Sequence, residues 1–142
     1  MTLWHYTCKH AAARIRRKGI VLPGRLLVPE NAYMWPVSWW TTMDEPDREA
    51  LGLTSIALSC DRTEYRFQPR KGELVVPYLS VADDPRLAAS LIPARLITAL
   101  GDPEVWWVSF YAVRVIEDMS WPGSRASLCL DRPAGGDHHV RA

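Results

Sequence analysis

The sequence has no apolar run close to the roughly 18 residues that a membrane-spanning helix needs, so we expect no membrane segment. Its first residues, MTLWHYTCKH, lack a charged segment followed by an apolar one, and no secretory signal is therefore expected. Cysteine is scarce, and its wide spacings give neither a disulfide framework nor a CxxC metal motif; the three residues are Cys8, Cys60 and Cys129. These absences favour a cytoplasmic protein whose thiols are reduced and buried.

The sequence also lacks an excess of charge of one sign. Its 17 basic and 16 acidic residues leave a formal net charge of +1, which argues against a protein held on nucleic acid mainly by positive charge. The net charge does not exclude a local basic patch. The hydrophobic share of 48% is that of an ordinary globular protein. The length of 142 residues suits a single domain, expected over residues 1–119, followed by a flexible tail over 120–142.

Phenylalanine is rare, with two residues, whereas there are seven tryptophans. This excess suits either a small core or a pocket in which a ligand ring stacks on an indole. We expect Trp106 and Trp107 to be core residues. In a strand, Trp39 and Trp40 face opposite ways, so one of them can line a pocket as a stacking platform. The alternative is that both are buried, on the two faces of a sheet.

Apolar runs and turn residues predict many short strands and few helices. The expected strands or extended pieces are 2–7, 20–24, 37–42, 54–60, 63–68, 73–81, 105–110 and 111–117. The expected helices are 8–18, 45–52 and 83–100, the last kinked by Pro93. Residues 24–36 are expected to form a loop, and residues 70–72 a hairpin turn. Because strands and helices do not alternate regularly, the sequence predicts a mixed α+β domain.

The first candidate site is LWHYT, at the start of the chain. In a strand, His5 shares a face with Leu3 and Thr7, while Trp4 and Tyr6 share the other. At a strand-to-helix junction, a ring nitrogen and a hydroxyl lie near open backbone N–H groups, which suits a ribose or an amide. The alternative is a half-buried core histidine bonded to a carbonyl group.

The second candidate is CDRTEYRF, which is rich in charge. If residues 62–67 form a strand, Arg62, Glu64 and Arg66 share one face. A carboxylate between two guanidinium groups stays ionised, so it could stabilise a positively charged transition state or bind a sugar hydroxyl. The alternative is a solvated face of ion pairs.

Motifs for other chemistries are absent, since the sequence holds no GxSxG, Walker A, GxGxxG or HExxH. His138 and His139 are adjacent in the expected tail. His5 and His10 flank the first strand-to-helix junction. Neither pair has a visible third ligand, so no metal site is expected.

Taken together, LWHYT, the helix that ends in KGIVLP, SWWTT and TEYRF resemble the ADP-ribosyltransferase superfamily, with its poly(ADP-ribose) polymerase and diphtheria-toxin-type enzymes. In that family a strand with a histidine comes first, an aromatic strand follows, and a strand with the catalytic glutamate comes later. His5, Trp40 and Glu64 occur in this order, and the match covers roughly residues 2–67. Several of these segments are also similar to small proteins of actinobacteria and their phages.

The resemblance implies a split, mainly antiparallel β-sheet core with a few short helices. It implies NAD as substrate, cleaved at the nicotinamide–ribose bond, with ADP-ribose passed to a protein, a nucleic acid or water. Glu64 would be catalytic, binding the ribose 2′-hydroxyl and supporting an oxocarbenium-like state, with Glu73 as the alternative. The implied nucleotide-binding residues are His5, Tyr6, Thr7, Trp39, Trp40 and Arg62, with Tyr33 as another choice for the stacking aromatic.

Two other functions stay open. One is a non-catalytic nucleotide-binding module on the same fold, which could sequester a signalling nucleotide. The other is an interaction domain in which all seven tryptophans are core or interface residues. The RNA 2′-phosphotransferase branch of the superfamily would need a more basic groove than this charge balance suggests. The oligomeric state is left open.

Overall fold

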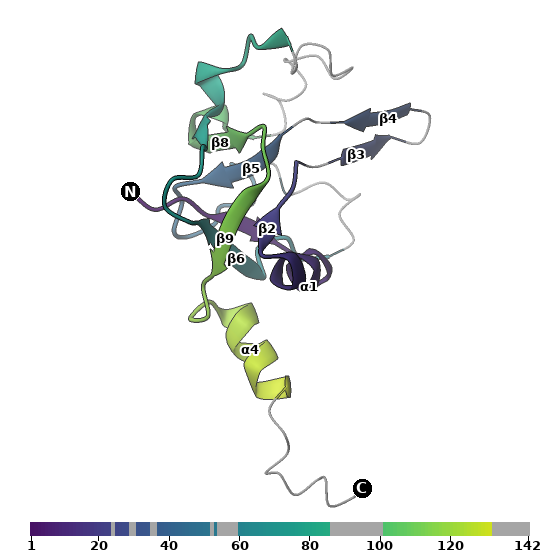
Figure 1. The fold of residues 1–142 in the computed structure, drawn as a ribbon, viewed down its shortest axis with the longest axis vertical. Coiled ribbons are helices and arrows are strands. Elements are labelled where there is room, and N and C mark those ends of the chain that lie inside the picture. Colours follow the sequence, from purple (N-terminus) through teal and green to yellow (C-terminus); the bar gives the residue numbers. More distant parts are fainter. Residues whose placement is uncertain are drawn as a thin grey trace, which may run out of the picture.

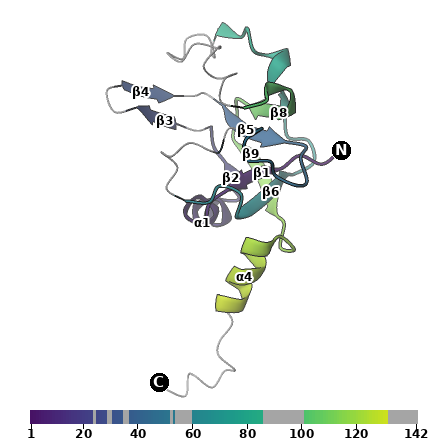
Figure 2. The same ribbon diagram turned by 180° about the vertical axis from the view of Figure 1, so that it is seen from behind.

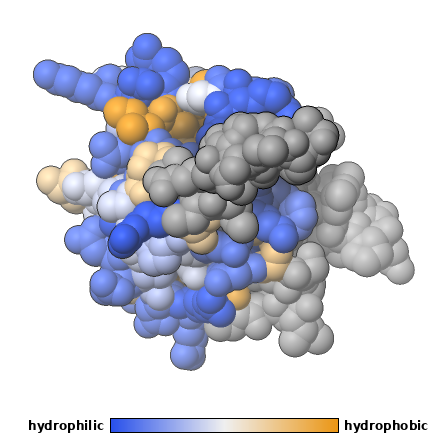
Figure 3. Space-filling view, turned by 90° about the horizontal axis from the view of Figure 1, so that it is seen from below, coloured by the Kyte–Doolittle hydropathy of each residue, from blue (hydrophilic) through white to orange (hydrophobic). Residues whose placement is uncertain are grey.

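The structure is a computed structural model that describes residues 1–23, 25–28, 31–34, 37–51, 53, 60–85 and 101–131. Figures 1 and 2 show the strands gathered in the middle of the molecule, with one helix against them and a second leading away below. None of the helices in these ranges is long and apolar enough to cross a membrane. In Figure 3, the side seen from below is mostly hydrophilic, with only small hydrophobic areas among the described residues.

A four-stranded antiparallel sheet is the centre of the fold, in the order β1-β6-β9-β2. Its strands are β1 (His5–Thr7), β6 (Tyr65–Pro69), β9 (Val113–Glu117) and β2 (Ile20–Val21). The helix α1 (Lys9–Lys18) joins β1 to β2. It ends at Gly19, whose φ of 72° is the left-handed conformation that glycine adopts easily, as its place after RIRRK predicted.

A second, three-stranded antiparallel sheet has the order β5-β8-β7. It consists of β5 (Ser38–Thr41), β8 (Trp106–Ser109) and β7 (Val76–Pro77). The two sheets join where Trp4 bridges Thr41, with backbone N···O distances of 2.7 and 2.9 Å in the two directions. The strand β1 therefore lies between β5 and β6.

Other elements surround these sheets. The hairpin of β3 (Arg25–Val28) and β4 (Asn31–Met34) projects to one side, as Figure 1 shows. Two short 3-10 helices, η1 (Tyr78–Ser80) and η2 (Pro103–Val105), flank the second sheet. The helix α4 (Pro122–Asp131) follows β9.

The core has two parts. The first lies between α1 and the strands that it covers, and its buried residues are Ala12, Ile15, Val21, Trp40, Tyr65, Phe67, Val113 and Val115. At the second sheet, they are Val37, Tyr78, Trp106 and Val108. Burial at roughly 25 cal/mol per Å² of apolar surface makes these clusters the main source of stability.

The mixed α+β class with mostly antiparallel strands is confirmed. Strands were correctly expected within 2–7, 37–42, 63–68, 105–110 and 111–117. The strand expected over 54–60 lies mostly outside the described residues, and so does most of the helix expected over 83–100.

Four predictions of elements differ from the structure. Residues 24–36, expected as a loop, contain the β3–β4 hairpin, and residues 48–51 form a turn in place of the short helix. The strand over 73–81 shrinks to Val76–Pro77, because Pro77 has no N–H to donate and the chain turns into η1. It pairs with β8 and not with β6.

The fourth difference concerns the tail expected from residue 120. Part of it forms α4, and Ser124 there is fully buried. The physical reason is that Trp121 anchors the start of this helix, donating from its indole N–H to the carbonyl oxygen of Thr63 at 2.9 Å. Residues 132–142 lie outside the described residues.

Candidate functional site

The strand order brings three distant segments side by side. His5 lies on β1, Trp40 lies on the neighbouring β5, and Glu64 directly precedes β6 on the other side. The sequence places these residues far apart, and antiparallel pairing brings the segments that carry them side by side. The junction of the two sheets is therefore the candidate site.

His5 is held by the strand beside it. Its Nδ1 lies 2.8 Å from the carbonyl oxygen of Trp39, and its ring centroid lies 5.2 Å from that of Trp40. Burial lowers the pKa of His5 most, and the positive charge of Arg62 lowers it further, while the bond to Trp39 opposes both. His5 is therefore neutral at pH 7. This contact matches the alternative of a core histidine bonded to a carbonyl group.

The two tryptophans of β5 do face opposite ways, as alternation predicted. Trp40 is only 2% exposed and donates its indole N–H to Ser38 Oγ at 2.8 Å. Trp39 packs its ring on the other side, 5.4 Å from the ring of Trp106 and 5.7 Å from that of Tyr78. A ligand ring could stack on Trp40 only if a neighbouring side chain moved.

Tyr6 lies on the face of β1 opposite to His5, as predicted, and its hydroxyl donates to the carbonyl oxygen of Met43 at 2.6 Å. Thr7 is 3% exposed and lies opposite Tyr65 in the sheet. Of the residues that the resemblance implied for nucleotide binding, Tyr6 thus belongs to a different surface from His5.

That surface is built around Arg66. Its guanidinium carbon lies 3.7 Å from the ring centre of Trp4 and 4.0 Å from that of Trp121, an arrangement that we call the Arg66 stack. Its Nε donates to Asp118 Oδ2 at 2.7 Å. The guanidinium thus contacts two indole rings and is also paired with a carboxylate, so the stack connects the start of the chain to the residue that directly precedes α4.

Glu64 lies in a turn before β6 and not within the strand, so the face shared by Arg62, Glu64 and Arg66 in our prediction does not form. Glu64 is half-buried, and its backbone abuts Gly123 of α4: a Cβ placed on Gly123 would lie 1.9 Å from the Glu64 carbonyl oxygen. No hydrogen bond or ion pair among the described residues joins Glu64 to His5. Arg62 is exposed, and its charge acts on both His5 and Cys60.

The alternative carboxylate, Glu73, is already paired. It accepts a hydrogen bond from Nε of Arg114, and this contact lowers the pKa of Glu73. Tyr33 lies on β4, where only the backbone is described. Neither residue is placed against His5 by a described contact.

The sequence reasoning missed Glu117, at the end of β9. Its carboxylate accepts two hydrogen bonds from Arg16 of α1, at 2.6 and 2.7 Å, and a third from the Ser124 hydroxyl of α4. Burial raises the pKa of Glu117, but the bonds from Arg16 and Ser124 outweigh it and the pKa is lowered. Glu117 lies opposite Phe67, which in turn lies opposite His5. No motif marks it, because Arg16 is distant in the sequence and the contact with Ser124 depends on how α4 packs after β9.

The reasoning also missed a cluster of Cys8, His10 and Cys60, whose ligand atoms all lie within 4.8 Å of one another. Both cysteines are free. Cys8 is buried as expected, whereas Cys60 is half-buried. His10 lacked a visible third ligand in the sequence because Cys60 follows a long intervening segment.

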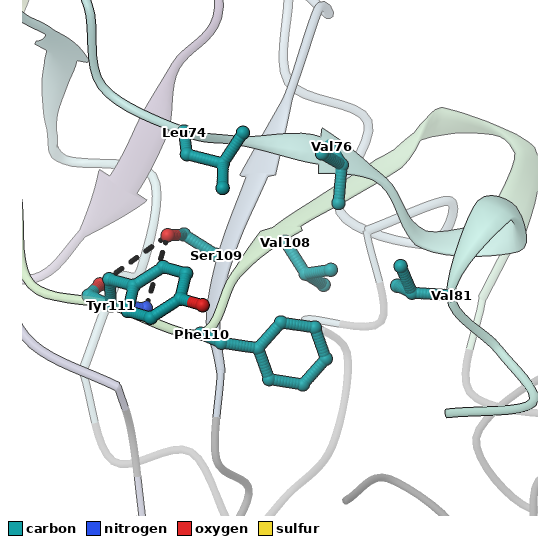
Figure 4. Close-up of a pocket in the computed structure, with 7 residues that line it drawn as sticks. All are labelled: Leu74, Val76, Val81, Val108, Ser109, Phe110 and Tyr111. Atoms are coloured by element: carbon teal, nitrogen blue, oxygen red, sulfur yellow. Dashed lines mark hydrogen bonds between the residues drawn. The ribbon is translucent and has the colours of Figure 1, made fainter. Parts of the chain in front are cut away.

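A shallow hollow of about 150 Å³ lies elsewhere, over the second sheet. Figure 4 shows Leu74 and Val76 on one side of it and Val108, Phe110 and Tyr111 on the other. The Ser109 hydroxyl in its lining already accepts from the Tyr111 N–H at 3.3 Å. A hollow lined mostly by apolar side chains does not indicate a reaction.

Comparisons with known proteins found no protein-family model, no curated protein and no solved structure that matches this chain.

Proposed function

We propose that the protein is an NAD-dependent ADP-ribosyltransferase or NAD glycohydrolase with an ADP-ribosyltransferase-like fold. It would break the nicotinamide–ribose bond and pass ADP-ribose to a protein, a nucleic acid or water. The proposal starts from the resemblance of the first half of the chain. The observation that supports it most is the strand order β5-β1-β6, with His5 between the strands that bring Trp40 and Glu64.

Cleavage of the nicotinamide–ribose bond needs little proton transfer by the side chains. Cleavage of the bond develops positive charge on the ribose, and a fixed carboxylate close to that charge lowers the barrier. Glu64 would supply this carboxylate, and neutral His5 would bind a ribose hydroxyl. Arg62 is exposed, and its positive charge acts on His5. Its planar guanidinium group would bind a phosphate through two parallel hydrogen bonds. Trp40 would form the wall behind His5. NAD is a cytoplasmic metabolite, and a cytoplasmic location is part of the proposal.

The test compares two glutamate variants. Purified protein is incubated with NAD, and nicotinamide release is followed by mass spectrometry. We expect Glu64→Gln to slow release at least about 100-fold, the usual cost of losing one group that stabilises developing charge. Binding of NAD should be largely kept. The matched control is Glu73→Gln, which should release nicotinamide at the rate of the parent protein. Equal rates for Glu64→Gln and the parent would overturn the assignment.

A second function, nucleotide binding without turnover, is favoured by one observation. No described hydrogen bond or ion pair joins His5 to Glu64, so the carboxylate is not held at the histidine. This function predicts saturable binding of NAD or ADP-ribose with no product. At a hundredfold excess over the dissociation constant, the ligand should stabilise the protein by ~2.7 kcal/mol. A thermal shift without nicotinamide release would favour this module over the transferase.

A further inference from the structure

The β1–β6 pairing builds a cluster of metal-ligand side chains. Because Thr7 lies opposite Tyr65 in antiparallel register, the residues after Thr7 run beside the residues before Tyr65. Cys8 and His10 come from the first segment, at the start of α1, and Cys60 comes from a bend in the second. Two sulfur atoms and one imidazole nitrogen thus lie within 4.8 Å of one another.

We propose that Cys8, His10 and Cys60 bind one zinc(II) ion, which clips the start of α1 to the segment before β6. A tetrahedral zinc with bonds of about 2.3 Å to sulfur and about 2.0 Å to nitrogen holds its ligand atoms roughly 3.5–3.8 Å apart. The three side chains therefore need to close by only about 1 Å, which is within the reach of small side-chain rotations. His10 is exposed and Cys60 is half-buried, so an ion can enter from solvent.

The donor set favours a soft or borderline ion. Two thiolates and an imidazole suit zinc and do not suit magnesium or calcium, which prefer oxygen ligands. Each thiol that binds the ion releases its proton to solvent, and two thiolates neutralise the charge of the ion.

The ion has a structural role in this proposal. Three protein ligands leave a fourth position for water. By fixing Cys60, the ion fixes the residues that follow it, Arg62 and Glu64 among them. The zinc site does not depend on the transferase activity, since it is argued from ligand geometry alone.

The test uses the full chain, purified under reductant and without chelator. Elemental analysis should find one zinc per chain. Cobalt(II), used as a spectroscopic probe, should give the intense visible absorption of a tetrahedral ion and a thiolate-to-metal charge-transfer band. Removal of zinc by a chelator should lower the melting temperature. These expectations concern metal binding and stability and need no enzymatic assay.

The ligand variants make the test specific. Loss of a group that only orients a metal ligand weakens metal binding about 10- to 100-fold. Loss of a ligand itself should weaken it by more than about 100-fold, and we expect this of Cys8→Ser, Cys60→Ser and His10→Ala. His10→Ala changes an exposed residue, so we expect this variant to keep the fold. Cys129→Ser, which removes the third cysteine of the sequence, is the matched control and should bind zinc as the parent does.

Two results would overturn the proposal. One is that the parent protein, with the thiols of Cys8 and Cys60 shown to be reduced, binds neither zinc nor cobalt(II) in a tetrahedral site. The other is a stable Cys8–Cys60 disulfide whose reduction yields no metal binding, since His10 has no part in a disulfide. Zinc loss in Cys129→Ser equal to that in the ligand variants would be a third such result, because it would show that the proposed ligand set is wrong.

Discussion

The Nδ1 atom of His5 lies 2.8 Å from the carbonyl oxygen of Trp39. A carbonyl oxygen can only accept a hydrogen bond, so Nδ1 carries the proton. In the neutral ring Nε2 then has no proton and is an acceptor. A hydroxyl of a bound sugar would thus donate to Nε2, and the backbone of β5 fixes this direction of donation.

His5 predicts a loss of stability on mild acidification. Its pKa is lowered by burial, so as pH falls below the unfolded value of about 6.5 the unfolded chain takes up this proton first. The stability is complete above that pH and declines below it. We expect the free energy of unfolding to fall less steeply between about pH 7.5 and pH 5.5 in His5→Asn, whose amide can still donate to Trp39.

Urea unfolding at several pH values measures this difference. Equal slopes for His5→Asn and the parent would show that His5 does not resist protonation in the folded protein.

The Arg66 stack predicts that arginine cannot be replaced by lysine. An ammonium group has no planar faces to stack between Trp4 and Trp121, and it cannot keep the same in-plane bonds. Arg66→Lys should lower the free energy of unfolding by about 1–3 kcal/mol. Arg114→Lys is a matched control with a small expected effect, because the Arg114 side chain is 64% exposed and solvent screens its ion pair. Similar losses in the two variants would contradict a special role of the stack.

We expect Gly123→Ala to destabilise the protein, although helix propensity alone would favour alanine over glycine. Within a helix, alanine is usually more stable than glycine by about 1 kcal/mol. At Gly123 the added Cβ would lie 1.9 Å from the carbonyl oxygen of Glu64, so α4 or the turn must shift. Gly123→Ala should therefore lower the melting temperature. The exposed Ala126 of the same helix provides a reference, since Ala126→Gly should show the ordinary propensity loss. A more stable Gly123→Ala would show that α4 does not pack on Glu64.

We expect the contribution of Glu117 to the free energy of unfolding to depend on pH, because its carboxylate is neutralised in acid. Its pKa is lowered by Arg16 and Ser124, so its contribution to stability is present above the unfolded value of about 4.3 and is lost as pH falls through the folded value. Glu117→Gln should cost about 1–2 kcal/mol at pH 7, because it removes a charged partner of a half-exposed arginine. The cost should shrink towards pH 3. A constant difference across this range, measured by denaturant unfolding, would rule out the ionic contribution.

Alternation along strands could be predicted from the sequence, because it follows from backbone geometry alone. Tyr65 and Phe67 are buried and Arg66 faces the other way, as expected from TEYRF, and Trp39 and Trp40 lie on opposite faces. The end of α1 at Gly19 follows from the same local reasoning.

Contacts between distant segments could not be predicted in this way. The cluster of Cys8, His10 and Cys60 depends on the antiparallel register of β1 and β6, which no local pattern specifies. The bonds of Glu117 depend on where two helices lie. A signal for the cluster did exist: once LWHYT and TEYRF are paired antiparallel, the cysteine after the first must approach residues before the second.

The Arg66 stack also has a consequence for synthesis, because it joins segments that leave the ribosome at different times. One indole of the stack is Trp4 and the other is Trp121, so the complete stack can form only after Trp121 has been synthesised. At about 5–20 residues per second, Trp121 follows Trp4 by on the order of ten seconds. During this interval the nascent chain carries Trp4 and Arg66 without the second indole of the stack.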